Sequence, residues 1–169
     1  MISFKNLTQS DLGHLSQKLS SFLKAGDIVG LTGPLGVGKT TLVKSLGQAF
    51  KIRPDDVVSP TFTLLNIYDA ALPIYHWDLY RVENEKELLA LDYEEYFYGK
   101  GICIVEWFDK LEQLKPSSYI EIQLKIVSIT QRDLTIEGHG EEGLILEKKL
   151  RNGLPRVACD PRNDRQVHA

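Results

Sequence analysis

One short motif constrains the fold of this chain more than any other feature. Residues 33–40 read Gly-Pro-Leu-Gly-Val-Gly-Lys-Thr and match the phosphate-loop pattern G-x-x-x-x-G-K-[ST]. The apolar run at 28–31 precedes the motif, and apolar residues at helical spacing follow it at 42–50. A strand that leads through a glycine-rich turn into a helix is the setting in which this pattern binds phosphates. The sequence therefore predicts a domain that binds a nucleoside triphosphate.

The residue types of the loop suit phosphate chemistry. Glycines such as Gly33 permit backbone conformations in which consecutive N–H groups turn toward phosphate oxygens. Lys39 can reach the β- and γ-phosphates, and Thr40 offers a hydroxyl to Mg²⁺. The alternative is a glycine-rich turn that merely joins a strand to a helix, which requires the motif and both flanks to match by chance.

Composition limits the classes that remain. The chain has 169 residues, of which 43% are hydrophobic and 25% charged, and this suits one domain with a sizeable core. A net charge of -3 argues against broad binding to a nucleic-acid backbone, so any connection with RNA is expected to be indirect. Two cysteines without metal-ligand or disulfide spacing, and the lack of a secretory or membrane-spanning apolar run, favour a cytoplasmic protein.

The order of strand and helix patterns predicts an α/β fold. We expect a single P-loop NTPase domain of three layers, with a mixed central sheet and a C-terminal β-hairpin. After an N-terminal strand and a helix that begins near Thr8, the expected elements are the strand and helix around the loop, a hairpin at 62–68 and 74–79, short helices at 83–91 and 93–98, a buried strand at 102–105, and a hairpin at 120–136.

The last part of the chain has a different composition. From Lys148 onward, arginines mix with Asn, Gly, Pro and Asp, and few apolar residues occur. Such a segment buries too little surface to offset its ordering entropy. We therefore expect a domain at 1–147 and a polar, disordered tail at 148–169, although a partner-binding arm remains an alternative.

A phosphate loop needs acidic partners, because Mg²⁺ prefers oxygen ligands. Glu106 ends the apolar run at 102–105, which places it at the carboxyl end of a buried strand, where open α/β sheets bind ligands. We predict that Glu106 is the metal-site acid. The alternative is a solvated carboxylate at the end of a strand.

A second acid, Asp78, lies in a strand-like segment. Alternation places His76 and Asp78 on one face of the strand, with Trp77 and Leu79 on the other. Such a pair could orient water or sense the γ-phosphate. For His76 alone, a hydrogen-bonded structural role is the leading alternative to proton transfer.

Two further features lie near these acids in the sequence. Segment 59–63 carries Ser59 and Thr61 between the loop helix and the next strand, where switch segments of P-loop proteins often supply hydroxyls. It could also be only a turn. Trp107 follows Glu106 and could pack by the nucleotide, face a partner, or belong to the core.

Four segments in this order together resemble the TsaE family, also called YjeE. They are the loop at 33–40, Ser-Pro-Thr-Phe at 59–62, His-Trp-Asp-Leu-Tyr-Arg at 76–81 and Val-Glu-Trp at 105–107. The resemblance implies a small cytoplasmic ATPase with Mg²⁺. Such a protein is required to make N6-threonylcarbamoyladenosine in tRNAs that read codons beginning with adenine.

The resemblance also implies roles for individual residues. Thr40 and Glu106 would hold Mg²⁺, and the remaining activity-sensitive positions would be Ser59, Thr61, Asp78 and Trp107. The nucleotide would be bound by the loop from Gly33, through Leu35, Gly36, Val37, Gly38, Lys39 and Thr40, with Thr41 adjacent. The implied partners are a TsaD-like transferase and a TsaB-like subunit, with tRNA contacted only through that assembly and no membrane involved.

Two other functions remain open at this point. A small-molecule kinase of the P-loop class would transfer the γ-phosphoryl group to a metabolite, although Arg81 and the isolated Arg132 make a poor arginine lid. A non-catalytic nucleotide-sensing module would leave Asp78 and Glu106 with structural roles. ATP is favoured over GTP because no N-K-x-D segment occurs, and Thr8 and Arg132 are candidates to flank the base.

Overall fold

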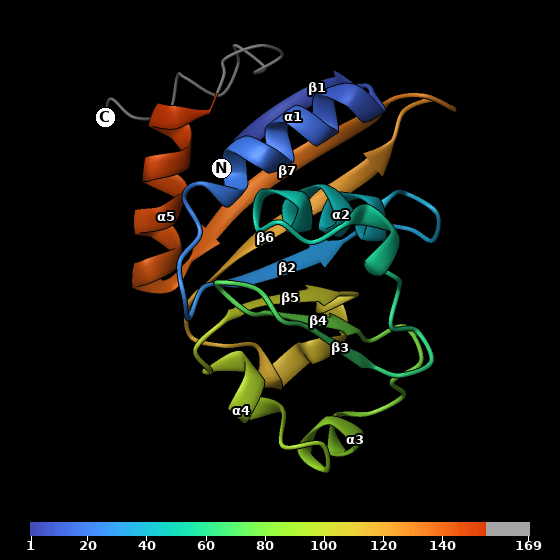
Figure 1. Cartoon of the computed structure of the whole chain (residues 1–169), viewed down its shortest axis with the longest axis vertical. Coiled ribbons are helices and arrows are strands. Elements are labelled where there is room, and N and C mark those ends of the chain that lie inside the picture. Colours follow the sequence, from blue (N-terminus) through green and yellow to red (C-terminus); the bar gives the residue numbers. More distant parts are fainter. Residues whose placement is uncertain (155–169) are drawn as a thin grey trace.

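Strands from both ends of the chain join one seven-stranded sheet in the computed structural model, which describes residues 1–154 (Figure 1). The strands are β1 (Ile2–Leu7), β2 (Ile28–Thr32), β3 (Leu65–Tyr68), β4 (Ile74–Asp78), β5 (Ile102–Glu106), β6 (Tyr119–Ile126) and β7 (Arg132–His139). The α-helices are α1 (Gln9–Ser20), α2 (Lys39–Ala49), α3 (Glu85–Leu89), α4 (Tyr93–Phe97) and α5 (Gly140–Gly153), and 3₁₀ turns lie at η1 (Pro54–Asp56) and η2 (Phe108–Leu114).

The sheet is mixed, as expected. Its strand order is β1-β7-β6-β2-β5-β4-β3, and the four central strands run parallel. Antiparallel pairs extend it at both sides: β3 with β4, and β7 with β6 and β1. The predicted α/β class, the mixed sheet and the C-terminal β-hairpin are therefore confirmed.

Two apolar cores lie on opposite faces of the sheet. On one face, Leu19 of α1 and Leu46 of α2 pack against strand residues such as Leu31. On the other face, the aromatic rings of Trp77 and Phe97 pack among residues of α3, α4 and η2. Because the central strands are buried on both faces, they read as nearly continuous apolar runs. No helix within residues 1–154 is long and apolar enough to cross a membrane.

The end of the domain differs from the expectation. We placed the boundary after residue 147, but α5 continues through Gly153, and Leu146, Leu150 and Leu154 are buried against the first core. Glycines lower the helix propensity of this segment, so its stability comes from packing rather than from the local sequence. Gly143 permits the close approach, because an added Cβ would lie 2.2 Å from the carbonyl oxygen of Tyr119 in β6. The remainder of the predicted tail, 155–169, lies outside the described residues.

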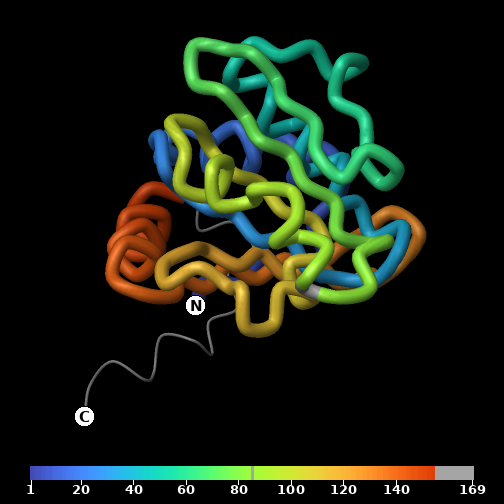
Figure 2. Tube along the Cα trace, turned by 90° about the horizontal axis from the view of Figure 1, so that it is seen from below, coloured from blue at the N-terminus to red at the C-terminus, as the bar shows by residue number. Residues whose placement is uncertain are grey.

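The parallel strands bring several loops to one edge of the sheet. The carboxyl ends of β2, β4 and β5 are neighbours, since Leu31 pairs with Glu106 and Glu106 pairs with Asp78. The turn between β6 and β7 (orange) lies beside the loop after β2 (light blue) in Figure 2, and the Nε of Arg132 donates to the carbonyl of Val37 at 2.9 Å. Residues far apart in the sequence thus meet at this edge.

Candidate nucleotide-binding site

The loop after β2 is a backbone cradle that glycines make possible. Gly33 and Gly38 have φ angles of 135° and 109°, which residues with side chains rarely adopt. At Gly33 an added Cβ would also lie 2.4 Å from the carbonyl oxygen of Leu124. Gly38 is the N-cap residue directly before α2, and no side chain among residues 1–154 caps this end of the helix. The N–H groups of the first helical turn therefore remain available to an anion, which the helix dipole also favours.

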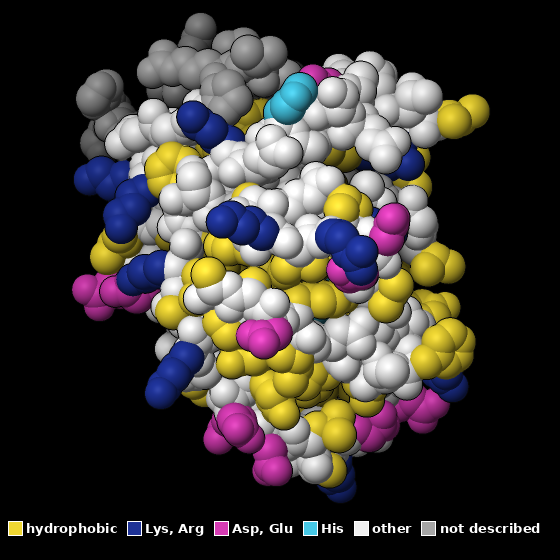
Figure 3. Space-filling model, viewed as in Figure 1, with side chains coloured by type: hydrophobic (Ala, Val, Ile, Leu, Met, Phe, Trp, Pro, Cys, Tyr) yellow, Lys and Arg dark blue, Asp and Glu magenta, His cyan; other side chains and the backbone are white. Residues whose placement is uncertain are grey.

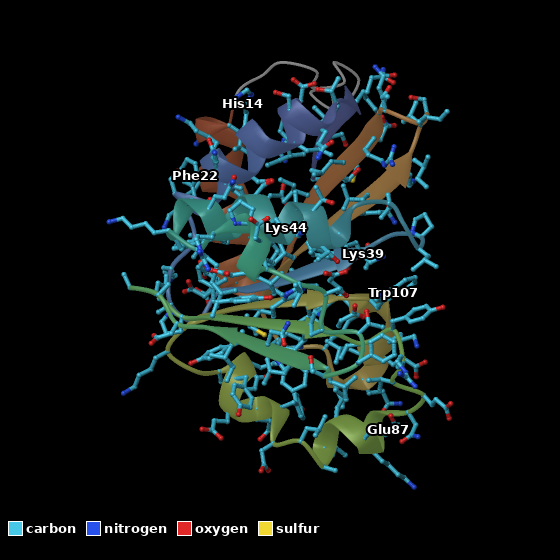
Figure 4. The ribbon with its side chains drawn as sticks, turned by 45° about the vertical axis from the view of Figure 1, so that its right-hand side comes forward. His14, Phe22, Lys39, Lys44, Glu87 and Trp107 are labelled. Carbon is cyan, nitrogen blue, oxygen red and sulfur yellow. The ribbon has the colours of Figure 1, made fainter. Side chains whose placement is uncertain are left out.

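Lys39 lies almost buried in this loop, with 5% of its surface exposed. Its Nζ donates hydrogen bonds to the carbonyls of Gly33 at 2.8 Å and Pro34 at 3.1 Å, and lies 3.8 Å from the centre of the Trp107 ring. Figure 4 shows Lys39 and Trp107 at the same edge of the sheet, with Lys44 farther along α2. Burial lowers the pKa of Lys39, against the opposing attraction of Glu106, Asp78 and Asp109. No carboxylate within the described part of the chain pairs directly with the ammonium group, so phosphate oxygens can replace the two carbonyls.

Thr40 and Glu106 meet beside the loop. The Thr40 hydroxyl donates to Oε1 of Glu106 at 2.7 Å, and Glu106 is only 3% exposed. The alternative of a solvated strand-end carboxylate is therefore wrong. Both groups are hard oxygen donors of the kind Mg²⁺ prefers, and nucleotide phosphates and water supply the other ligands in sites of this type. Within residues 1–154 no cluster of three His, Cys, Asp or Glu side chains suits a metal ion, so a metal here would depend on ligands from the nucleotide and water.

Asp78 organises the segment that follows α2. Its Oδ2 accepts hydrogen bonds from the hydroxyls of Ser59 and Thr61, each at 2.7 Å, while Oδ1 accepts from the N–H of Tyr80 at 2.9 Å. Asp78 is 2% exposed. The two hydroxyls also lie 2.7 Å from each other. Three of the residues expected to affect activity thus form one hydrogen-bonded cluster.

His76 has different partners from those we expected. It does lie on the same face of β4 as Asp78, but the two side chains do not form a working pair. Nε2 of His76 is 2.9 Å from Oε1 of Glu106, and Nδ1 is 3.3 Å from the hydroxyl of Tyr68. The reason is the strand register, because β4 pairs with β5 so that His76 lies opposite Ile104, near the Glu106 end.

Trp107 is half-buried and packs against the second apolar core. Its backbone is in the left-handed region, with a φ of 60°, and its ring lies 5.0 Å from the ring of Tyr80. Together with its position over Lys39, this makes Trp107 a wall of the site. Leu35, at the tip of the loop, is 70% exposed.

A pocket of about 470 Å³ adjoins the other side of the loop. Thr8 and Arg132, which we named as candidates to flank the base, both line this pocket, and so does Thr41. The Arg132 guanidinium also donates to the carbonyl of Ser128 at 2.7 Å, so it joins the β6–β7 turn to the loop. Hydrogen bonds to both segments thereby hold the side chain at the edge of the pocket.

Sequence reasoning missed the roles of Tyr68 and Asn66. Both lie on β3, and Asn66 pairs with His76 across the hairpin. Asn66 Nδ2 donates to the Val58 carbonyl at 3.1 Å. The predicted hairpin was the available indication, but the sequence does not give the register that places these side chains beside the site.

The fold and the site together define the class. A phosphate loop lies between a central parallel strand and a helix, with a buried acid at the end of the adjacent strand, as in P-loop nucleotide-binding proteins. The family model described as "Threonylcarbamoyl adenosine biosynthesis protein TsaE" matches residues 7–134. The chain belongs to the TsaE family, and the resemblance noted in the sequence is confirmed.

Known proteins agree with this assignment. The tRNA threonylcarbamoyladenosine biosynthesis protein TsaE of Bacillus subtilis is 35% identical over 150 residues, covering 88% of this chain and 93% of the relative. The protein of the same name from a Nostoc species is 45% identical over 111 residues, covering 63% of this chain and 67% of the relative. The crystal structure of Bacillus subtilis YdiB superposes with a TM-score of 0.74 at 29% identity, covering 90% of this chain and 97% of that one.

Proposed function

We propose that this chain is a Mg²⁺-dependent ATPase that acts with partner proteins in forming N6-threonylcarbamoyladenosine in tRNA. The partners are a TsaD-like transferase and a TsaB-like subunit, and the tRNAs are those that read codons beginning with adenine. The observation that carries the ATPase part is the meeting of Thr40 and Glu106 at 2.7 Å beside Lys39. The family and the names of its members support the tRNA part.

On this proposal each group of the site has one task. The loop amides and Lys39 bind the β- and γ-phosphates, and Thr40 and Glu106 hold Mg²⁺, which when bound neutralises charge on the phosphate oxygens. Asp78, with Ser59 and Thr61, orients the attacking water, because its buried carboxylate holds both hydroxyls and a carboxylate can accept a proton from water. Trp107 holds Lys39 from one side until phosphate replaces that contact.

The pocket lined by Thr8, Thr41 and Arg132 is proposed to receive the adenine. Its volume of about 470 Å³ suits a nucleoside, and it adjoins the loop through Gly36 and Gly38. Arg132 offers a planar guanidinium that can lie against a base, and backbone carbonyls that include those of Val37, Ser128 and Gln131 hold it in place.

Indirect contact with tRNA agrees with the surface. The net charge is -3, and Figure 3 shows Lys and Arg interspersed with Asp and Glu on the face it presents. Exposed apolar side chains lie near the site instead, with Phe62 84% exposed and Leu35 70% exposed. Such residues suit a protein partner better than a phosphate backbone. The proposal also places this function in the cytoplasm.

The test is phosphate release from ATP by the purified chain, measured alone and with the transferase and its companion subunit. A rise that depends on both the partners and Mg²⁺ is the expected result. Rapid transfer of phosphate to a metabolite by the isolated chain would favour a kinase. Nucleotide binding without any hydrolysis in the full assembly would favour a sensing module.

A further inference from the structure

We propose that His76 and Tyr68 position the Glu106 carboxylate and join it to the segment that carries Ser59 and Thr61. They would act as positioning residues. A change at Glu106, the proposed Mg²⁺ ligand, would then also change the segment whose hydroxyls contact Asp78. The inference rests on the proposed function, since it assigns a task to buried groups beside the proposed Mg²⁺ ligand.

The chain of contacts begins at one oxygen atom. Oε1 of Glu106 accepts the Thr40 hydroxyl at 2.7 Å and lies 2.9 Å from Nε2 of His76. His76 has no exposed surface, so solvent cannot substitute for this contact. On the other side of the ring, Nδ1 lies 3.3 Å from the hydroxyl of Tyr68. The orientation of the carboxylate therefore depends on a ring that is itself held at both nitrogens.

Tyr68 and Asn66 connect this ring to the segment at 58–63. The Tyr68 hydroxyl is 3.1 Å from the Val58 carbonyl, and Nδ2 of Asn66 is 3.1 Å from the same carbonyl. The Thr63 hydroxyl donates to Oδ1 of Asn66 at 3.1 Å. Asn66 and Tyr68 thus hold both ends of the segment whose middle residues contact Asp78.

The hydrogens available at Tyr68, His76 and Asn66 are enough to satisfy these contacts together. The Tyr68 hydroxyl carries one hydrogen and has two acceptors within reach, His76 Nδ1 and the Val58 carbonyl. When it donates to Nδ1, the hydrogen on Nε2 is donated to Glu106, and Asn66 donates to the Val58 carbonyl. The ring nitrogens of His76, the Tyr68 hydroxyl and the Val58 carbonyl then all have partners. Outer-shell partners of this kind orient metal-binding side chains, and their loss typically lowers metal affinity about 10- to 100-fold.

The first measurement is the affinity for ADP, without metal and with Mg²⁺, together with Mn²⁺ binding to the ADP complex by electron paramagnetic resonance. We expect His76→Leu to weaken Mn²⁺ binding about 10- to 100-fold while the metal-free ADP affinity stays within about twofold. Tyr68→Phe removes only a hydroxyl and should weaken Mn²⁺ binding about 2- to 10-fold. His76→Gln should recover most of the loss, because its amide N–H can reach the same oxygen. Tyr75→Phe is the matched control, since that ring packs against Tyr96 on the opposite face.

The second measurement is amide hydrogen exchange in segment 58–63. Addition of Mg²⁺ to the ADP complex should slow exchange there in the unsubstituted chain and in Tyr75→Phe, but not in Tyr68→Phe. Unchanged Mn²⁺ affinity in folded His76→Leu, or in Tyr68→Phe if the leucine variant does not fold, would overturn the positioning role alone. Failure of the unsubstituted chain to bind ADP under any condition would instead overturn the proposed function, and this inference with it.

Discussion

The Thr40 hydroxyl and the Glu106 carboxylate lie 2.7 Å apart, although 66 positions separate the two residues in the chain. Their meeting follows from the register of two parallel strands. Leu31 of β2 pairs with Glu106 of β5, so the acid lies beside the strand that leads into the phosphate loop. A shift of one residue would turn the carboxylate to the other face of the sheet.

Glu106→Gln should reduce the contribution of metal to nucleotide binding. The amide keeps the volume but loses the charge that favours a divalent cation, so we expect ADP affinity in Mg²⁺ to fall about 10- to 100-fold, or ~1.4–2.8 kcal/mol. Isothermal titration with and without Mg²⁺ measures the difference. The control is Glu87→Gln on α3, far from the loop in Figure 4, where no change is expected. Equal Mg²⁺ dependence in both variants would remove Glu106 from the metal site.

Lys39→Ala should weaken ATP binding about 10- to 100-fold, because charge-assisted hydrogen bonds to phosphate oxygens are lost. The matched control is Lys44→Ala, which removes the same charge farther along α2 (Figure 4). The contact of Lys39 with the Trp107 ring adds an optical readout, since phosphate binding should withdraw the ammonium and change tryptophan fluorescence. Trp107→Phe should abolish that change. Persistence of the full signal in Trp107→Phe would assign it to Trp77 instead.

Asp78→Asn should impair turnover rather than binding. The amide can still accept from the N–H of Tyr80, but its NH₂ group cannot accept from the Ser59 and Thr61 hydroxyls. We expect the turnover number in the assembled system to fall about 10²- to 10⁴-fold, with ATP affinity within a few fold of the unsubstituted chain. Single-turnover kinetics with labelled ATP separate the two quantities. A pure loss of affinity would show that Asp78 only holds the segment in place.

Gly33→Ala should destabilise the fold even without nucleotide. Gly33 has a left-handed backbone, and an added Cβ would lie 2.4 Å from the carbonyl oxygen of Leu124. We therefore expect the free energy of unfolding to fall by about 1 to 3 kcal/mol. Gly13→Ala is the contrasting substitution, because Gly13 lies inside α1 with nothing within 4 Å of an added Cβ. It should stabilise the protein by about 0.5 to 1 kcal/mol. Denaturant titration measures both, and a neutral Gly33→Ala would contradict the loop geometry.

The pKa of Asp27 predicts that the free energy of unfolding depends on pH. Burial raises the pKa of this carboxyl above its ordinary value of 3.8, and the hydrogen bond from the Lys24 N–H opposes that rise only in part. The native state therefore binds more protons than the unfolded state just above pH 3.8, and the contribution of Asp27 to stability falls as the pH rises through that window.

Asp27→Asn removes this dependence while its side-chain oxygen can still accept from Lys24. As the pH rises from acid to neutral, the free energy of unfolding of the variant should increase relative to that of the unsubstituted chain. Thermal unfolding across that range measures the gain. A gain that is the same at every pH would show that Asp27 does not titrate differently in the two states.

The sequence predicted most of the fold because its patterns are local. Alternating and helical periodicities located the central strands, α1, α2 and both hairpins, with bounds that differ by a few residues from those observed. The helix α5 was not predicted at all, since Gly140, Gly143 and Gly153 lower its propensity and its apolar residues are stabilised by packing against distant parts of the chain.

The sequence alone determined the phosphate loop and the place of Glu106 at the end of a buried strand, because each follows from a short run of consecutive residues. Only the tertiary structure decided which side chains those residues meet. His76 contacts Glu106 rather than working with Asp78, and Arg132 is joined to Val37, through strand registers and a turn that bring distant segments together. The physical reason is that hydrogen bonds act over about 3 Å, whereas one position of register moves a side chain to the opposite face of the sheet.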